Sequence, residues 1–165
     1  MKDMLVRLLD LPDISKMEEK LRRENIIIRR PIPPEKSILI NWVSTHFGMY
    51  WGNEVDVAFS QLPVNCFIAQ KGNDILGFAC FETTAKNFFG PTGTLESMRG
   101  KGIGKTLLVK SLEAMKEMGY AYAIIGGVGP AEFYKNTVGA TPIKGSEISV
   151  YQNLLRKNNE QANKE

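Results

Sequence analysis

A glycine-rich segment that runs directly into a helix constrains this chain more than any other feature. The segment spans residues 99–106 and reads Arg-Gly-Lys-Gly-Ile-Gly-Lys-Thr. Glycine admits positive φ values, and it has no Cβ to keep a ligand away from the backbone. The first amides of a helix lack internal partners and lie at the positive end of the helix dipole. Such a site binds phosphate groups, so the sequence predicts a phosphorylated ligand.

Three anion-binding loop patterns can be compared with this segment. The P-loop pattern G-x-x-x-x-G-K-[ST] shares Gly104-Lys105-Thr106, but its first glycine would fall on Arg99. The dinucleotide pattern G-x-G-x-x-G begins at Gly100 and Gly102, but its third glycine would fall on Lys105. The pattern [RQ]-x-x-G-x-[GA] is met without a gap by Arg99, Gly102 and Gly104.

The elements around the loop follow a strand–loop–helix–strand–helix order. A strand is expected within residues 88–96, ahead of the loop. The apolar stripe Leu108, Leu112 and Met115 predicts a helix over residues 105–118. Residues 120–125 are then typical of a buried strand, and Pro130 is a favoured first residue for a second, short helix.

This arrangement resembles the GNAT superfamily of acetyl-CoA-dependent N-acetyltransferases. The resemblance rests on Arg99, Gly102 and Gly104 and on the later pair Phe133-Tyr134, which is followed by Gly139. It covers the order of elements over roughly residues 26–155 and is specific mainly over residues 90–143. It implies an α/β (α+β) GNAT fold. In that fold a mixed, mostly antiparallel central sheet is splayed between its fourth and fifth strands and flanked by helices.

The resemblance also implies acetyl-CoA as the acetyl-donor cosubstrate. Many members place an asparagine just after the fifth strand to bond the pantetheine arm. That position is Gly127 here, so either a backbone group substitutes or the contact is absent. The residues implied to bind the cosubstrate are strand residues, whose backbones pair with the pantetheine arm, and loop residues, whose amides hold the pyrophosphate: Gly93, Thr94, Leu95, Arg99, Gly100, Lys101, Gly102, Ile103, Gly104, Lys105 and Thr106.

The implied chemistry is direct attack of a primary amine on the acetyl carbonyl in a ternary complex. A backbone amide near Thr94 or Leu95 is expected to stabilise the oxyanion that develops. Tyr134 is the candidate general acid for the leaving thiolate. The attacking amine must be neutral, which calls for a base. The candidate bases are Glu82, Glu96 and Glu54. No metal-ligand constellation is visible. Two other readings remain open: a regulatory module that binds acetyl-CoA without catalysis, and a P-loop-type nucleotide-binding protein.

Composition is that of an ordinary globular chain. The 165 residues carry a formal net charge of +3, which gives no reason to expect a nucleic-acid partner. No apolar run reaches the ~18 residues of a membrane span. We expect one cytoplasmic domain over residues 1–165, as a monomer or homodimer, with an amine acceptor of unknown identity. Cys66 and Cys80 are expected to be buried free thiols.

The rest of the chain supplies helices on either side of the sheet. Residues 4–24 are predicted to be helical and broken at Pro12, which makes 1–25 an extra helical segment. Phe47, Tyr50 and Trp51 are expected either to contact the acceptor or to close the core. The other predicted elements are strands at 26–28, 66–70, 75–81, 141–143 and 148–155, helices at 35–47 and 54–61, and a polar tail at 156–165.

Overall fold

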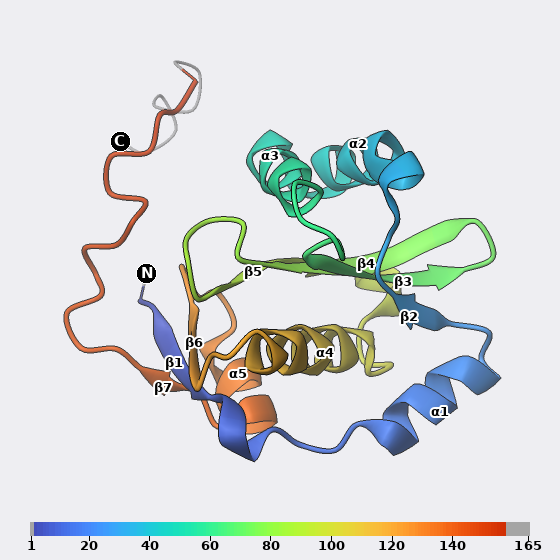
Figure 1. Ribbon diagram of the computed structural model, residues 1–165, viewed down its shortest axis with the longest axis horizontal. Coiled ribbons are helices and arrows are strands. Elements are labelled where there is room, and N and C mark those ends of the chain that lie inside the picture. Colours follow the sequence, from blue (N-terminus) through green and yellow to red (C-terminus); the bar gives the residue numbers. More distant parts are fainter. Residues whose placement is uncertain (1, 158–165) are drawn as a thin grey trace.

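The centre of the structure is a twisted sheet, seen in a computed structural model that describes residues 2–157 (Figure 1). Within those residues seven strands pair in the order β2-β3-β4-β5-β6-β1-β7. Neighbouring strands are antiparallel everywhere except between β5 and β6, which are parallel. The expected mixed, mostly antiparallel sheet is therefore confirmed.

The strands divide into two halves on either side of the parallel pair. The first half comprises β2 (Ile27–Arg29), β3 (Cys66–Lys71), β4 (Asp74–Phe81) and β5 (Phe88–Thr94). The second half comprises β6 (Tyr122–Ile125), β1 (Met4–Arg7) and β7 (Thr141–Pro142). The strands predicted at 66–70 and 75–81 are confirmed as β3 and β4, which pair antiparallel as a hairpin that turns at Gly72 and Asn73.

The helices lie on both faces of the sheet. Figure 1 shows α2 and α3 on its upper side and α4 on its lower side. No helix within residues 2–157 combines the length and the apolar character needed to cross a bilayer. The α-helices are α1 (Ser15–Arg23), α2 (Lys36–Phe47), α3 (Met49–Ala58), α4 (Ile103–Glu117) and α5 (Ala131–Val138). The predicted helix at 54–61 therefore begins earlier, immediately after Gly48, whose φ of 100° ends α2.

Two apolar clusters hold these layers together. The predicted stripe Leu108, Leu112 and Met115 is completely buried between α4 and the sheet. On the opposite face, Val43 and Val55 from α2 and α3 pack in a second cluster that also contains Phe78, Cys66 and Cys80. Both cysteines are free and buried, as predicted. The sheet is thus packed against helices on both faces, and this packing holds β5 and β6 in place.

The parallel pair β5–β6 separates after two residue pairs. Phe88 lies opposite Ile124 and Phe89 lies opposite Ile125, and the pairing ends there. β5 continues to Thr94 and remains paired with β4 on its other edge. The next residues explain the separation, because Gly90 has a φ of 115° and Pro91 has no amide to donate. We call the point where the strands part, at Phe89, Ile125 and Gly126, the vertex.

The N-terminal prediction was wrong for residues 4–7. These residues form β1, which pairs with both β6 and β7 and so lies inside the sheet. Met4 and Val6 are buried whereas Arg7 is exposed, which is the two-residue period of a strand. Only Ser15–Arg23 of the predicted helical segment is an α-helix. The first residues are therefore a structural part of the sheet.

The predicted closing strand at 148–155 was also wrong. Within the described chain, residues 148–155 form turns and irregular backbone without strand pairing. β1 already occupies the position beside β6 and β7, so this segment has no free sheet edge there. Ile148 and Val150 are accordingly exposed. Of the predicted tail at 156–165, residues 158–165 lie outside the described part of the structure.

The role of the N-terminal residues in stability can be tested with two neighbouring leucines. Leu8 is 0% exposed, and its amide donates to the carbonyl of Ala121 at 2.9 Å, whereas Leu9 is 60% exposed. Leu8→Ala is expected to lower the free energy of unfolding by about 2–5 kcal/mol through the lost apolar contacts and the cavity left behind. Leu9→Ala should stay within about 0.5 kcal/mol of the wild type. Urea titrations of both variants measure the difference.

Candidate active site

The glycine loop adopts the backbone that its sequence requires. Gly100 and Gly102 have φ values of 80° and 91°, in the left-handed region that favours glycine. Gly102 is the N-cap of α4, and its carbonyl accepts the amide of Thr106 at 3.0 Å. The amides at the very start of the helix precede this first bond and point out of the helix end. The loop therefore forms an amide-lined helix start.

The loop adjoins the end of β5 that was predicted to bind the same ligand. The Oγ1 atom of Thr94 lies 3.6 Å from the position that a Cβ on Gly104 would occupy. Lys105 is half-buried, whereas Arg99 and Lys101 are exposed beside the loop. Beyond the vertex, residues 90–94 have no strand partner on the β6 side. The structure thus brings the predicted strand and loop residues together, while their binding role remains a prediction.

On the β6 side of the point where β5 and β6 separate, Asp3, which directly precedes β1, contacts the residues that follow β6. Gly127, which stands at the position where the family often has asparagine, has a φ of 58°. Its amide donates to Oδ1 of Asp3 at 2.8 Å. That amide is therefore occupied and does not substitute for the missing asparagine in this arrangement.

Tyr134 lies beside the vertex on the α4 face of the sheet. Its side chain projects from α5 and is 6% exposed. Its ring meets that of Phe89, the last paired residue of β5, edge-on with centroids 6.4 Å apart. Burial raises the pKa of Tyr134 to about 12, so the hydroxyl keeps its proton at any physiological pH. It can act there as a hydrogen-bond donor.

Three polar side chains approach the vertex from the α3 face. The Thr84 hydroxyl, in the loop between β4 and β5, donates to Oε1 of Glu54 on α3. Burial raises the pKa of Tyr151, and the neighbouring Thr84 hydroxyl partly opposes that shift. The Tyr151 hydroxyl lies 3.6 Å from the position of a Cβ on Gly126, at the vertex itself. Burial raises the pKa of Glu54 above its usual value, although the Thr84 bond partly opposes that shift.

A match to a protein-family model identifies the family of this chain. Residues 33–136, more than half of the chain, match the model of the acetyltransferase (GNAT) family. The chain is a GNAT family member. Members of this family use acetyl-CoA as acetyl donor. The same family was inferred from the loop and from the Phe133-Tyr134 pair, and that inference is confirmed. A search among curated proteins gave no match.

Solved structures of GNAT proteins share the fold at low sequence identity. The GCN5-related glucosamine N-acetyltransferase region of a fungal multi-domain β-N-acetylglucosaminidase has a TM-score of 0.68 at 15% identity. The match covers 86% of this chain and 19% of that one. GCN5-related N-acetyltransferases from Sphaerobacter thermophilus and Kribbella flavida give TM-scores of 0.60 and 0.53 at 17% and 15% identity. Each covers 86% of this chain, which spans 48% and 53% of theirs.

Two of the three candidate bases lie in settings that suit other roles. Glu82 has a side chain only 5% exposed, and its carboxylate accepts the amide of Asn87 at 2.5 Å. A hydrogen bond to Glu82 also raises the pKa of Tyr120, so this carboxylate ties the β4–β5 loop to the start of β6. Glu96 is exposed to solvent. Of the three candidates, Glu54 is the one that is half-buried and whose carboxylate is bonded to a hydroxyl. Within residues 2–157, no group of His, Cys, Asp and Glu is arranged to hold a metal ion.

The aromatic residues after α2 divide between packing and surface contact. A Cβ on Gly93 would lie 2.6 Å from the ring of Phe47, which therefore presses directly on the β5 backbone. Phe47 stacks on Trp51 with ring centroids 5.6 Å apart, and both pack against the second apolar cluster. These two rings close the core in the structure. Tyr50 instead donates its hydroxyl to the carbonyl of Leu155 at 3.2 Å.

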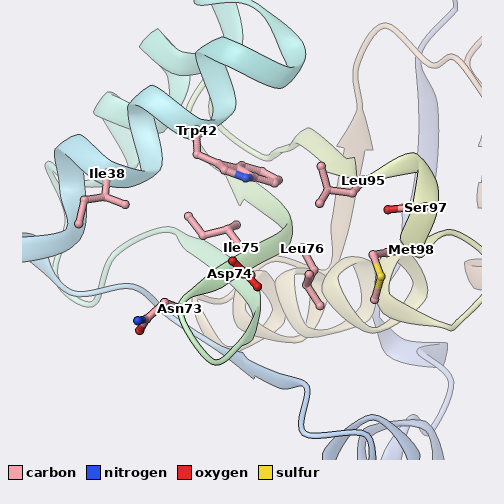
Figure 2. Close-up of a pocket in the computed structure, with 9 residues that line it drawn as sticks. All are labelled: Ile38, Trp42, Asn73, Asp74, Ile75, Leu76, Leu95, Ser97 and Met98. Atoms are coloured by element: carbon pink, nitrogen blue, oxygen red, sulfur yellow. The ribbon is translucent and has the colours of Figure 1, made fainter.

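A pocket of about 350 Å³ lies at the other end of β5 from the vertex (Figure 2). Figure 2 shows the ring of Trp42 on α2 facing Leu95 across the opening, with Asp74 at the β3–β4 turn. The stretch from Phe89 to Leu95 spans roughly 20 Å at ~3.3 Å per residue. The pocket is therefore separate from the vertex. Its lining residues are Ile38, Trp42, Asn73, Asp74, Ile75, Leu76, Leu95, Ser97 and Met98.

Two residues of the candidate site, Thr84 and Tyr151, were not predicted from the sequence. Thr84 lies in an irregular loop, and Tyr151 lies in the segment that was predicted as a strand. Neither belongs to a motif with fixed spacing. Both reach the site through long-range contacts that bring α3, the β4–β5 loop and the C-terminal segment together. Glu54 was named as one of three candidates, but only the structure separates it from the others.

Proposed function

We propose that this chain is an N-acetyltransferase that moves the acetyl group of acetyl-CoA to a primary amine by direct attack in a ternary complex. One observation carries the proposal. A protonated tyrosine hydroxyl, that of Tyr134, and a half-buried carboxylate, that of Glu54, flank the vertex from opposite faces of the sheet. Membership of the GNAT family and the amide-lined loop support the choice of donor.

Acetyl-CoA would run from the loop to the vertex. The amides that open α4 would hold the pyrophosphate, with Lys101 and Lys105 adding positive charge. The pantetheine arm would pair with the free edge of β5 at Gly93 and Thr94, as a peptide strand would. The Leu95 amide is not free for this role, because it donates to the carbonyl of Leu76 on β4 at 2.9 Å. That direction would place the thioester toward the vertex.

Glu54 would remove the proton from the acceptor amine. An alkylamine resembles lysine, whose pKa is about 10.4, and is therefore mostly protonated at neutral pH. Burial raises the pKa of Glu54, which makes its carboxylate a stronger base than an exposed one. The location of Glu54 on the face opposite α4 separates it from the leaving group.

Tyr134 would stabilise the departing thiolate chiefly as a hydrogen-bond donor. A thiol resembling cysteine has a pKa of about 8.5, whereas the pKa of Tyr134 is raised to about 12. Complete proton transfer from the phenol to that thiolate would therefore be uphill by about 5 kcal/mol. A hydrogen bond to the developing charge requires no such transfer, and it is stronger than a bond between neutral groups.

Removing the Tyr134 hydroxyl should slow turnover without weakening acetyl-CoA binding. A hydrogen bond to a charged group contributes about 1.5–3 kcal/mol, so Tyr134→Phe should lower kcat about 10- to 150-fold. Steady-state kinetics and calorimetric titration with acetyl-CoA measure the two quantities separately. Tyr122→Phe is the matched control, because Tyr122 is exposed at the far end of β6. A Tyr134→Phe variant with wild-type kcat would remove Tyr134 from the mechanism.

The acetyl-transfer proposal is tested by thiol release from acetyl-CoA in the presence of amines. The panel includes glucosamine, the acceptor named for the fungal region with the same fold, together with lysine, spermidine and a peptide with a free α-amino group. Turnover with any of them supports the proposal. Acetyl-CoA binding without turnover across the panel would favour a regulatory module. Thermal stabilisation by ATP in place of acetyl-CoA would favour a nucleotide-binding protein.

A further inference from the structure

The pocket at the other end of β5 from the vertex (Figure 2) combines apolar walls with one carboxylate. Leu76, Leu95 and Met98 contribute the apolar side chains. Figure 2 shows the Asp74 carboxylate below the ring of Trp42, with Leu95 beside the ring and Leu76 beside the carboxylate. The volume of about 350 Å³ falls within the ~300–1,000 Å³ typical of small-molecule sites. The pocket therefore has the size and the lining of a site for a small molecule with an apolar body.

The Asp74 carboxylate is available to a ligand. Within residues 2–157 it accepts no hydrogen bond and forms no ion pair. Lys71 lies directly opposite Asp74 in the β3–β4 pairing, yet no ion pair joins the two side chains. Lys36, at the start of α2, is instead paired with Asp56 at 2.6 Å. A negative charge without a protein partner thus borders an apolar opening, which is the arrangement that attracts a cation.

The ring of Trp42 is held in place before any ligand enters. Phe47 and Phe78 meet it edge-on, with ring centroids 5.7 and 6.3 Å away. His46, one turn further along α2, lies 4.7 Å from it. The ring is still partly exposed, and it borders the pocket. Tryptophan is the aromatic residue that attracts a cation over its face most strongly.

The wall on the β5 side is also fixed, by backbone hydrogen bonds. The amide of Leu95 donates to the carbonyl of Leu76 at 2.9 Å, and the amide of Met98 donates to the carbonyl of Leu95 at 2.9 Å. These bonds join the short helix Glu96–Met98 to β4. Both walls are therefore formed in advance, so that a ligand loses little affinity to the ordering of the protein.

We propose that this pocket is a binding site for a small organic cation, namely a primary ammonium group on an apolar body. The ammonium group would lie between the Asp74 carboxylate and the ring of Trp42, and the apolar body would pack on Leu76, Leu95 and Met98. The site is separate from the vertex and does not depend on acetyl transfer.

The polar groups of the pocket favour a cation over other ligand classes. An ammonium group has three hydrogens to donate. Besides Asp74, the hydroxyl of Ser97 and the carboxamide of Asn73 border the pocket and can accept them. An anion would be repelled by Asp74. A neutral ligand would gain the apolar contacts but neither the ion pair nor the attraction to the aromatic ring.

Titration with 2-phenylethylamine, in the absence of acetyl-CoA, tests the site. An alkylamine resembles lysine, whose pKa is about 10.4, so this probe is a cation at neutral pH. Calorimetry on the unaltered protein should show saturable binding. The chain has two tryptophans, so Trp51→Phe leaves Trp42 as the only indole, and its fluorescence should change with the same dissociation constant. 2-Phenylethanol keeps the phenyl ring without the charge and should bind at least about tenfold more weakly.

Asp74→Asn separates the carboxylate from the rest of the pocket. Asp74 is exposed beside a turn, so the variant should fold. Its affinity for 2-phenylethylamine should fall at least about tenfold, whereas its affinity for 2-phenylethanol should be unchanged. Asp10→Asn is the matched control, because Asp10 is an exposed aspartate that pairs with Arg7 and does not line the pocket.

The possible results each bear on the site directly. A loss of affinity in Asp74→Asn with none in Asp10→Asn would support it. Absence of saturable binding to the unaltered protein at millimolar 2-phenylethylamine would overturn it. Equal affinities for the amine and the alcohol, or wild-type affinity in Asp74→Asn, would also overturn it, the latter by placing the amine elsewhere on the protein. Because no titration contains acetyl-CoA, none of these results decides the acetyltransferase proposal.

Discussion

Glu54→Gln is expected to lower kcat/KM for the amine about 10²- to 10⁴-fold, the range typical of general acid–base catalysis. Glutamine keeps the size of the side chain and can still accept the Thr84 hydroxyl, but it cannot take up a proton at neutral pH. Affinity for acetyl-CoA should be unchanged, because Glu54 lies on the face of the sheet opposite α4 and the loop. Initial rates at varied amine concentration give the kinetic loss.

The same substitution should not reduce stability at neutral pH. Burial raises the pKa of Glu54 in the folded state. The stability that this group contributes is therefore present below its unfolded pKa and is lost as the pH rises through its folded pKa. Above that folded-state pKa the buried carboxylate is ionised and opposes folding, and glutamine, which cannot ionise, removes that opposition. A melting temperature equal to or above that of the wild type, together with low activity, would distinguish a catalytic carboxylate from a structural one.

The pH dependence provides a further signature of Glu54. The base must be ionised, so kcat/KM should rise with pH through the pKa of Glu54, at a pH above the usual value for glutamate because burial raises that pKa. This acidic limb should disappear in Glu54→Gln. Glu96→Gln should keep both the wild-type rate and the limb, because Glu96 is exposed to solvent. Loss of activity in Glu96→Gln with normal activity in Glu54→Gln would reverse the assignment.

Features fixed by local chemistry were predictable from the sequence. The positive φ at Gly100 and Gly102 follows from glycine in a tight turn, and the buried stripe on α4 follows from its helical period. The separation of β5 from β6 was expected from the family resemblance, and in the structure it occurs at Gly90 and Pro91. Each of these signals lies within a few residues of the structure that it determines.

Features fixed by long-range pairing were not predictable in the same way. Residues 4–7 are too few for a two-residue alternation to be distinguished from one face of a helix, and pairing with β6 and β7 makes them a strand. Once β1 holds that position, residues 148–155 have no partner there, and Tyr151 turns toward the vertex instead. One missed strand thus accounts for two errors and hides part of the candidate site.

The choice of base shows the same limit. Glu54 and Glu82 are the same residue type and both come close in sequence to strands of the sheet, so the sequence alone does not indicate which of them is the better candidate base. What separates them is what each carboxylate contacts: Glu82 accepts the amide of Asn87, whereas Glu54 accepts the hydroxyl of Thr84 in the β4–β5 loop. Such contacts depend on how the β4–β5 loop folds back against α3, which no spacing in the sequence encodes.

Gly104→Val is expected to abolish acetyl-CoA binding while leaving the protein folded. A Cβ on Gly104 would lie 3.6 Å from Thr94 Oγ1 and 3.9 Å from the ring of Phe133, which are ordinary contacts. The branched side chain would extend into the space in front of the α4 amides, where the pyrophosphate would sit. Gly102 is a poorer test, because a Cβ there would lie 2.2 Å from the sulfur of Met17 and would require a φ of 91°.

Thermal shift and calorimetry with acetyl-CoA measure the loss of binding in Gly104→Val. At a hundredfold excess over its dissociation constant, the ligand should stabilise the wild type by about 2.7 kcal/mol and the Gly104→Val variant by almost nothing. Lys116→Val is the matched control, since it places the same β-branched residue at an exposed position in the last turn of α4. Wild-type affinity in a folded Gly104→Val variant would show that the helix start does not hold the cosubstrate.

The loop and Glu54 lie on opposite faces of the sheet, so the two variants should affect different quantities. Gly104→Val should reduce the affinity for acetyl-CoA, whereas Glu54→Gln should reduce the rate of acetyl transfer.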